Sequence, residues 1–291
     1  LEFKQSIQQI EILYLILASI FLWLSVWLRG LRWKWLFKDS SSPSISSLYR
    51  AELIGYFGNN VLPLRLGEVL RAYIVGKENN YSKSFVFGTV IMERLTDMLA
   101  LIIFSIILFF LYPFEDGWVN NFILKGGLIL SVMIITLFVI SRYKINSKHN
   151  KLTNLLNQLL DGLQSIKKQR IIPVVIVSII IWSIYLFDVY LIQLAFQFNI
   201  NWTQSLTILV ISSLALSIPS APGMIGTFHA AVKYTMVDIF AFSPNDGNSF
   251  AIMMHAYGYI LFTVLGAYYF LKSQFHDHAI DNVLKTDPKN L

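Results

Sequence analysis

The segment Asn59–Tyr73, NNVLPLRLGEVLRAY, places two arginines, a glutamate and two helix-breaking residues inside an apolar sequence. Arg65, Glu68 and Arg71 are spaced at i, i+3 and i+6, so they share roughly one face of a helix. Guanidinium groups beside a broken helix, whose free N–H groups carry partial positive charge, suit an anion and above all a phosphate. The pattern predicts an anion-binding cluster open to the cytoplasm, with Asn60 as a neighbouring contact. The alternative is an interfacial helix with solvated charges.

A second group of charges, Glu93, Arg94 and Asp97, falls inside a long apolar run. Burying three charges separately would cost roughly 8–10 kcal/mol on insertion scales. Arg94 and Asp97 are three residues apart and can pair. Two interpretations stay open: an ion network that docks this segment onto its neighbour, or a headgroup or proton site. Asp188, alone in another apolar run, is a third candidate because intramembrane carboxylates mark functional sites.

The composition predicts an integral membrane protein. Of 291 residues, 55% are hydrophobic and 14% are charged, whereas soluble domains average about 25% charged residues. The absence of cysteine excludes disulfides, Fe–S clusters and thiolate zinc sites, and we expect no other metal site or cofactor. We expect the net charge of +6 to serve orientation in the membrane and not nucleic-acid binding. Five spans are predicted: Ile12–Leu28, Ser84–Tyr112, Phe122–Ser141, Ile171–Ala195 and Ser249–Leu271.

Charge asymmetry between the connections predicts the topology. Basic clusters follow the first, third and last spans and precede the fourth, which places these ends and the C-terminus in the cytoplasm. We expect Arg29 and Arg32, at the end of the first span, to be interfacial anchors. The alternation works if Leu48–Val75 and Thr203–Phe240 enter and leave on one side as re-entrant hairpins. The abrupt start in an amphipathic stretch suggests that an upstream span is missing.

The two predicted hairpins share a Pro-x-x-x-Gly pattern. Pro222 and Gly226 follow Pro63 and Gly67 at an offset of 159 residues, and the same offset relates the flanking spans. Broken backbone at membrane depth is tolerated only inside protein or beside a water-filled cavity. The chain is therefore predicted to be an all-α polytopic membrane protein with two inverted-topology repeats and re-entrant broken helices around a central cavity. It forms a single domain, 1–291, with repeat 1 at about 10–112, a linking span and amphipathic helix at about 120–168, and repeat 2 at about 171–272.

Four sequences, RGLRWKWLF, GYFGNNVLPLRLGEVLRAY, MERLTDMLAL and IPSAPGMIGTFHAA, resemble the lysylphosphatidylglycerol synthase transmembrane region, also called the flippase-like or UPF0104 family. The resemblance covers nearly the whole chain and implies the handling of anionic lipids. Family members usually begin with one more span, in agreement with a missing upstream segment. Pro222, Gly223, Gly226 and His229 belong to the second motif, and we expect its bend from Pro219 to Gly226 to form the outer half of the substrate-binding site. His229 stands where many members have a glutamate.

We therefore predict a lipid flippase that moves an anionic headgroup between leaflets of the inner (cytoplasmic) membrane. An aminoacyl-phosphatidylglycerol and a polyprenyl-phosphate lipid are both candidate substrates. Two alternatives stay open: a membrane-embedded transferase acting on a lipid-phosphate carrier, and a non-transporting lipid-binding accessory subunit. The sequence lacks a P-loop, an H-E-x-x-H motif and a D-x-D signature, so we expect no enzymatic activity. Oligomeric state is open, a homo-oligomer included.

Overall fold

The computed structural model describes residues 10–37, 42–111, 117–142, 151–217 and 221–286. This part of the chain is helical and contains no strand, and five helices are long and apolar enough to cross a membrane. They coincide with the five predicted spans. In chain order the elements are α2 (Ile12–Trp35), α3 (Ile45–Val61), η1 (Pro63–Arg65), α4 (Gly67–Glu78), α5 (Lys83–Leu111), α6 (Gly117–Ser141), α7 (Lys151–Leu163), η2 (Lys168–Arg170), α8 (Ile171–Ala195), α9 (Trp202–Leu216), η3 (Pro222–Met224), α10 (Thr227–Tyr234), η4 (Thr235–Ile239) and α11 (Pro244–Thr286).

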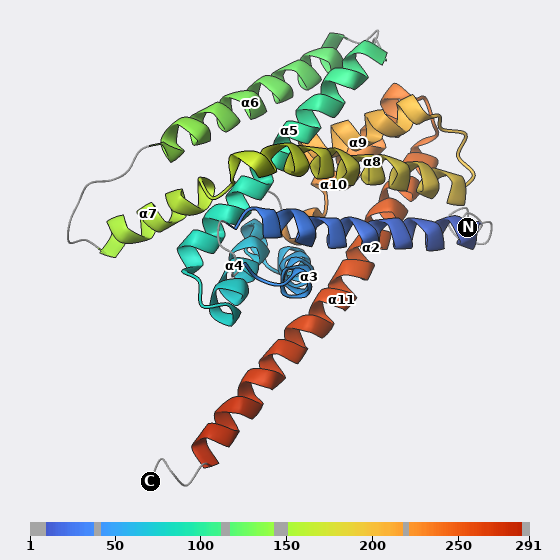
Figure 1. Ribbon diagram of the computed structural model, residues 1–291. Helices are drawn as coiled ribbons and strands as arrows, with labels where there is room; N and C mark the ends of the chain where they lie inside the picture. Colours follow the sequence, from blue (N-terminus) through green and yellow to red (C-terminus); the bar gives the residue numbers. More distant parts are fainter. Residues whose placement is uncertain (1–9, 38–41, 112–116, 143–150, 218–220, 287–291) are drawn as a thin grey trace.

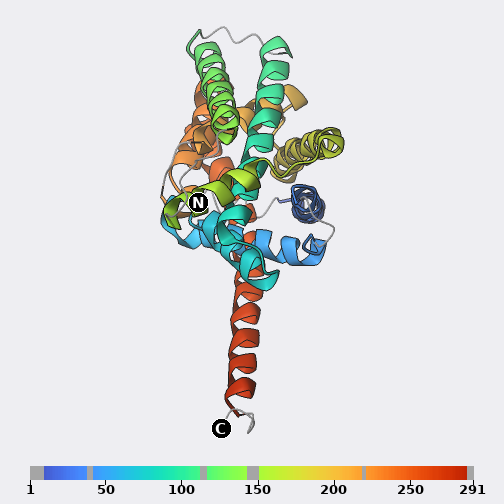
Figure 2. The same cartoon turned by 60° about the vertical axis from the view of Figure 1, so that its left-hand side comes forward.

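Helices α2 and α8 lie side by side and run in opposite directions (Figures 1 and 2). At one end, the backbone N–H of Glu11 donates to the carbonyl of Ala195 at 2.9 Å. At the other end, Arg170 Nη1 donates to the carbonyl of Phe37 at 3.0 Å. The first span of each predicted repeat is therefore packed antiparallel to its counterpart.

A second antiparallel pair joins α3 to α11. Asn60, near the end of α3, donates from Nδ2 to Thr263 Oγ1 at 2.8 Å, while Tyr49, near the start of α3, packs edge-on against Tyr269. Gly266 makes this approach close, because a Cβ there would lie 2.2 Å from the carbonyl oxygen of Leu53. The far end of α11 then leaves the body of the molecule as a single projecting helix (Figures 1 and 2).

Two breaks, one after α3 and one after α9, have matching backbone conformations. Leu64 and Arg65 have φ values of 55° and 55°. At an offset of 159 residues, Gly223 and Met224 have φ values of 63° and 59°. In each break a proline begins the short 3₁₀ turn, where its missing N–H removes no intrahelical hydrogen bond. The left-handed residues then redirect the chain into α4 and α10, as the two Pro-x-x-x-Gly patterns predict.

The amphipathic segment after the third span forms α7, which packs along α5 at a glycine-to-glycine crossing. A Cβ on Gly88 would lie 2.2 Å from the carbonyl oxygen of Leu159, and one on Gly162 would lie 2.1 Å from that of Phe85. The absence of side chains at both positions allows the two backbones to touch. Helix α7 therefore fixes the cytoplasm-facing end predicted for α5 to the body of the protein.

Candidate functional site

Eight charged residues from four helices form one cluster, called here the ion cluster, in which six are buried and Glu68 and Arg94 are partly exposed. Its centre is Arg29 of α2, whose Nη1 lies 2.7 Å from Glu93 Oε1 and whose Nη2 lies 2.9 Å from Asp97 Oδ2. Its Nε donates to the hydroxyl of Tyr185 in α8 at 2.9 Å. The members are Arg29, Arg32, Glu52, Glu68, Arg71, Glu93, Arg94 and Asp97.

Arg32 is fully buried in this cluster, at 0% exposure. Its Nη1 lies 2.8 Å from Asp97 Oδ1 and donates to Ser178 Oγ of α8 at 2.9 Å. The expectation that Arg29 and Arg32 are interfacial anchors is therefore wrong. The reason is that α2 continues without interruption to Trp35, so both guanidinium groups lie on the helix face that meets carboxylates of α5 and hydroxyls of α8.

Arg71 of α4 is also buried, at 1% exposure, and it bridges two carboxylates. Its Nη1 lies 3.0 Å from Glu93 Oε2 and forms a second ion pair with Glu52 of α3, while its guanidinium carbon lies 4.7 Å from the centroid of the Trp33 ring. The sequence predicts that Arg65, Glu68 and Arg71 share a face that is open to the cytoplasm. For Arg71 this prediction is wrong. The i, i+3, i+6 spacing does not put Arg65 on one helix face with Glu68 and Arg71, because the Arg65 backbone is left-handed and α4 begins after it, at Gly67.

The remaining members complete a neutral cluster. Arg94 Nε lies 2.8 Å from Glu68 Oε1, and Arg94 Nη1 lies 3.4 Å from Asp97 Oδ2. With these pairs, four arginines face four carboxylates, so the formal charges cancel. Buried charges are tolerated when each has a partner. The cluster therefore has the chemistry of an ion network that docks α2, α3 and α4 onto α5, the first of the two interpretations of Glu93, Arg94 and Asp97.

Arg65 lies outside this cluster and has no carboxylate partner within the described part of the chain. Its Nη2 donates to the carbonyl of Leu216 and lies 4.0 Å from Met224 Sδ in the second break. Its neighbours Leu64 and Leu66 are 73% and 42% exposed. A partly accessible cation thus sits between apolar side chains on the surface.

The two breaks contact each other around Arg65, and we call this region the crossing site. Its other members are Asn60, Gly223, Met224 and Tyr259. Asn60 Nδ2 donates to the Tyr259 carbonyl at 3.3 Å, and a Cβ on Gly223 would lie 2.6 Å from the Tyr259 ring. Tyr259 had no sequence signal, because a tyrosine in an apolar span resembles ordinary membrane-facing sequence.

Two histidines adjoin the crossing site. The rings of His229 and His255 are 4.7 Å apart between centroids, and the ring of His255 is 5.7 Å from that of Tyr259. His229 Nδ1 accepts a hydrogen bond from the backbone N–H of Gly226 at 3.4 Å. His229 therefore takes part in starting α10, as the side chain at the third position of that helix.

The other predicted site residues lie apart from Arg65 or at its edge. Pro222 is exposed and begins η3, whereas Pro219 lies outside the described residues. Asp188 of α8 is 8% exposed and belongs to no ion pair in the described part of the protein. The structure thus separates the predicted residues into the neutral ion cluster, the crossing site and Asp188.

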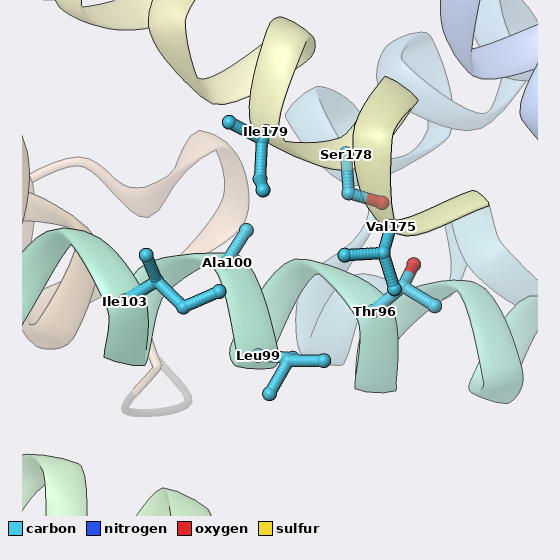
Figure 3. A pocket seen from close by; sticks show the side chains of 7 residues that line it. All are labelled: Thr96, Leu99, Ala100, Ile103, Val175, Ser178 and Ile179. Atoms are coloured by element: carbon cyan, nitrogen blue, oxygen red, sulfur yellow. The ribbon is translucent and has the colours of Figure 1, made fainter. Parts of the chain in front are cut away.

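A shallow depression of about 190 Å³ lies between α5 and α8 and not between the two breaks (Figure 3). Its side chains are mainly aliphatic, with Thr96 and Ser178 together at one end. Both hydroxyls are already used: Thr96 donates to the Glu93 carbonyl at 2.7 Å, and Ser178 donates to the Val174 carbonyl at 2.8 Å. This depression therefore offers an anion no free donor.

Comparison with known proteins places these features in a family. The family model described as the lysylphosphatidylglycerol synthase TM region matches residues 2–266. A UPF0104 membrane protein of Methanocaldococcus jannaschii is 28% identical over 242 residues, which covers 80% of this chain and 98% of that protein. A second UPF0104 membrane protein of the same organism is 24% identical over 278 residues, covering 87% of this chain and 82% of that protein. No solved structure matches.

Proposed function

Because the chain belongs to the lysylphosphatidylglycerol synthase TM region family, we propose that it moves an anionic lipid between the leaflets of the cytoplasmic membrane. The observation that carries this proposal is Arg65, a partly accessible cation with no carboxylate partner among the described residues, at the contact between two helix breaks. A guanidinium group in this setting matches a phosphate. The substrate class is a phospholipid or a lipid phosphate.

The apolar surroundings of Arg65 favour a lipid over a free anion. Leu64 and Leu66 flank it in sequence and are exposed, and Ile225 of the second break is 57% exposed. A lipid places its phosphate beside apolar chains, so one molecule can contact both kinds of group. A charged side chain without a counter-ion is costly at membrane depth, and a bound phosphate removes that cost.

Two inverted repeats with re-entrant hairpins provide the framework for this movement. The antiparallel α2 and α8, and the same left-handed conformation at Leu64 and Gly223, support the repeat. In this arrangement the α3–α4 hairpin enters and leaves on one side of the membrane, and the α9–α10 hairpin enters and leaves on the other. The two hairpins meet at the crossing site. A headgroup moves past Arg65 through the predicted central cavity, while its acyl chains stay in the bilayer. The basic clusters support a cytoplasmic C-terminus.

The ion cluster has a supporting role in this mechanism. It holds the first hairpin to α2 and α5, so that Arg65 projects from a rigid base. The second hairpin has no such cluster: its described residues from Trp202 to Phe228 carry no acidic or basic side chain, and His229 follows them. It also continues into a π-helix at Thr235–Ile239, a distortion often associated with functional movement. We propose that the second hairpin moves against the first, and that the protein performs no covalent chemistry.

Headgroup accessibility in proteoliposomes tests the proposal. Purified protein is reconstituted with a fluorescent phosphatidylglycerol, an aminoacyl-phosphatidylglycerol or a polyprenyl phosphate, and a membrane-impermeant reagent reports the outer-leaflet fraction. We expect transfer of at least one anionic lipid by the wild type and its loss in Arg65→Ala. Arg50→Ala is the matched control, because Arg50 is an exposed arginine whose Nη2 lies 3.7 Å from Glu78.

The other outcomes discriminate between the alternatives. Folded wild-type protein that transfers none of these lipids would overturn the flippase proposal. Lipid binding without transfer would then identify an accessory subunit, and turnover with a sugar or aminoacyl donor would identify a transferase. Equal transfer by wild type and Arg65→Ala would leave a flippase but overturn the role of Arg65.

A further inference from the structure

Asp188 differs from every carboxylate of the ion cluster. Glu52, Glu93 and Asp97 are each paired with arginine. Asp188 is buried in the last third of the candidate span α8, and its Oδ1 has no hydrogen-bond partner among the described residues. A carboxylate buried without a cation is strongly disfavoured relative to its neutral acid form. Asp188 is thus suited to bind and release a proton.

The charged and titratable groups on the helices around α8 leave Asp188 without a counter-ion. The cations nearest in the fold are committed elsewhere, because the guanidinium groups of α2 pair with α5 carboxylates. Helix α9 carries no titratable residue. The Asp188 carboxylate acts electrostatically on the hydroxyl of Tyr257 in α11. The other such residues on these elements, for α11 up to Ser273, are Glu11, Tyr14, Arg29, Arg32 and Lys34 of α2 and its cap, Lys83, Glu93, Arg94 and Asp97 of α5, Lys168 and Arg170 of η2, Tyr185 and Tyr190 of α8, and Asp246, His255, Tyr259, Tyr268, Tyr269 and Lys272 of α11.

Helix α11 connects Asp188 physically to the crossing site. Tyr257 is close enough to Asp188 for the carboxylate to act on its hydroxyl, while Tyr259, two residues later, contacts Asn60 and Gly223 at the breaks. Residues two apart on a helix point in nearly opposite directions. Helix α11 therefore packs against the helix that carries Asp188, and its Tyr259 face forms a wall of the crossing site. A change in charge at Asp188 therefore alters the packing of α11, the helix that links Asp188 to the crossing site.

We propose that Asp188 is a protonation site that couples proton binding to lipid movement at the crossing site. In the step, the Asp188 carboxylate takes one proton from water and forms a carboxylic acid, and the reverse step returns that proton to water. This inference rests on the proposed lipid movement and assigns the proton role to Asp188, not to Glu93 or Asp97, whose charges are already neutralised by arginines.

The first test measures the carboxyl group directly and does not depend on transport. Infrared difference spectroscopy of the detergent-solubilised protein, titrated with acid and alkali, should show a carboxylic-acid C=O band for wild type that Asp188→Asn lacks. Asp246→Asn is the matched control, because Asp246 is a carboxylate at the exposed start of α11 that accepts from the Ser243 hydroxyl at 2.8 Å. An identical band in wild type and Asp188→Asn would overturn the protonation site.

The second test measures coupling. In proteoliposomes, an imposed pH gradient should change the rate of lipid transfer by wild type and by Asp246→Asn, and this dependence should be lost in Asp188→Asn, whose amide imitates the protonated acid. A folded Asp188→Asn variant that keeps the full dependence would overturn the coupling. Absence of transfer in wild type would instead overturn the proposed function, while the infrared result would still decide whether Asp188 binds a proton.

Discussion

Arg65 and Met224 occupy the same position in two Pro-x-x-x-Gly motifs 159 residues apart, and their side chains meet, with Arg65 Nη2 4.0 Å from Met224 Sδ. Both residues are left-handed, at φ values of 55° and 59°. The contact brings the midpoints of the two breaks together. The Arg65 guanidinium thus meets the polarizable Met224 thioether and the backbone carbonyl of Leu216 instead of a carboxylate.

Cross-linking tests this contact. The natural sequence has no cysteine, so Arg65→Cys with Met224→Cys creates a single pair of thiols. We expect a short bifunctional thiol reagent to join them within one molecule, because the side chains touch. Mass spectrometry of the proteolysed protein detects the linked peptides. The pair Arg50→Cys with Met224→Cys is the control, and equal cross-linking of both pairs would contradict the arrangement.

Removing one partner from the ion cluster should strongly destabilise the protein. Arg71→Ala leaves Glu52 without its cation and removes one of the cations of Glu93, and breaking a buried pair costs about 3–5 kcal/mol. The change is measured as a fall in the free energy of unfolding in mixed micelles. Arg50→Ala should cost about 0.2–1 kcal/mol, as for a surface pair.

A double variant separates pairing from packing. Glu52→Gln with Arg71→Gln removes the charge of both partners, so we expect a smaller loss of stability than the sum of the two single changes. Strict additivity would mean that Glu52 and Arg71 do not interact in the folded protein, in contradiction to the ion pair described.

Gly67→Ala should separate α4 from α3. A Cβ at Gly67 would lie 2.0 Å from the carbonyl oxygen of Gly55 and 2.5 Å from the backbone nitrogen of Asn59, so the backbones must move apart. Gly127→Ala in α6 is the control, since a Cβ there meets open space and alanine is favoured in helices by about 0.5–1 kcal/mol. Thermal unfolding in detergent should show a lower midpoint for Gly67→Ala and an unchanged or higher one for Gly127→Ala.

Substitutions at the matched left-handed positions Leu64 and Gly223 should change the free energy of unfolding in opposite directions. Gly223→Ala introduces a Cβ at a φ of 63° and 2.6 Å from Tyr259 Cε2, so it should lower the free energy of unfolding. Leu64→Gly relieves a left-handed leucine whose conformation costs about 1–2 kcal/mol, and Leu64 is 73% exposed, so little packing is lost. A fall in stability of Leu64→Gly as large as that of Gly223→Ala would contradict the shared backbone geometry.

Much of the architecture could be predicted because it depends on local properties of the chain. Long apolar runs with few charges predict spans, since a membrane helix must satisfy its own backbone and bury little charge. Proline and glycine predict where a helix stops, and both breaks occur where the two motifs place them. The amphipathic spacing in α7 is likewise local. The family resemblance is confirmed over residues 2–266.

The partners of the charged side chains could not be predicted in the same way. Sequence alone favours Arg29 and Arg32 as interfacial anchors, because nothing local distinguishes a guanidinium that reaches the membrane surface from one that meets a carboxylate 64 residues later, as Arg29 meets Glu93. The packing of four helices also assigns Arg71 to the ion cluster and leaves Arg65 outside it. Spans and breaks follow from the free energy of each segment in its solvent, which the sequence by itself determines. Which charges are neutralised follows from distances of a few ångströms between distant segments, and only the tertiary structure decides those.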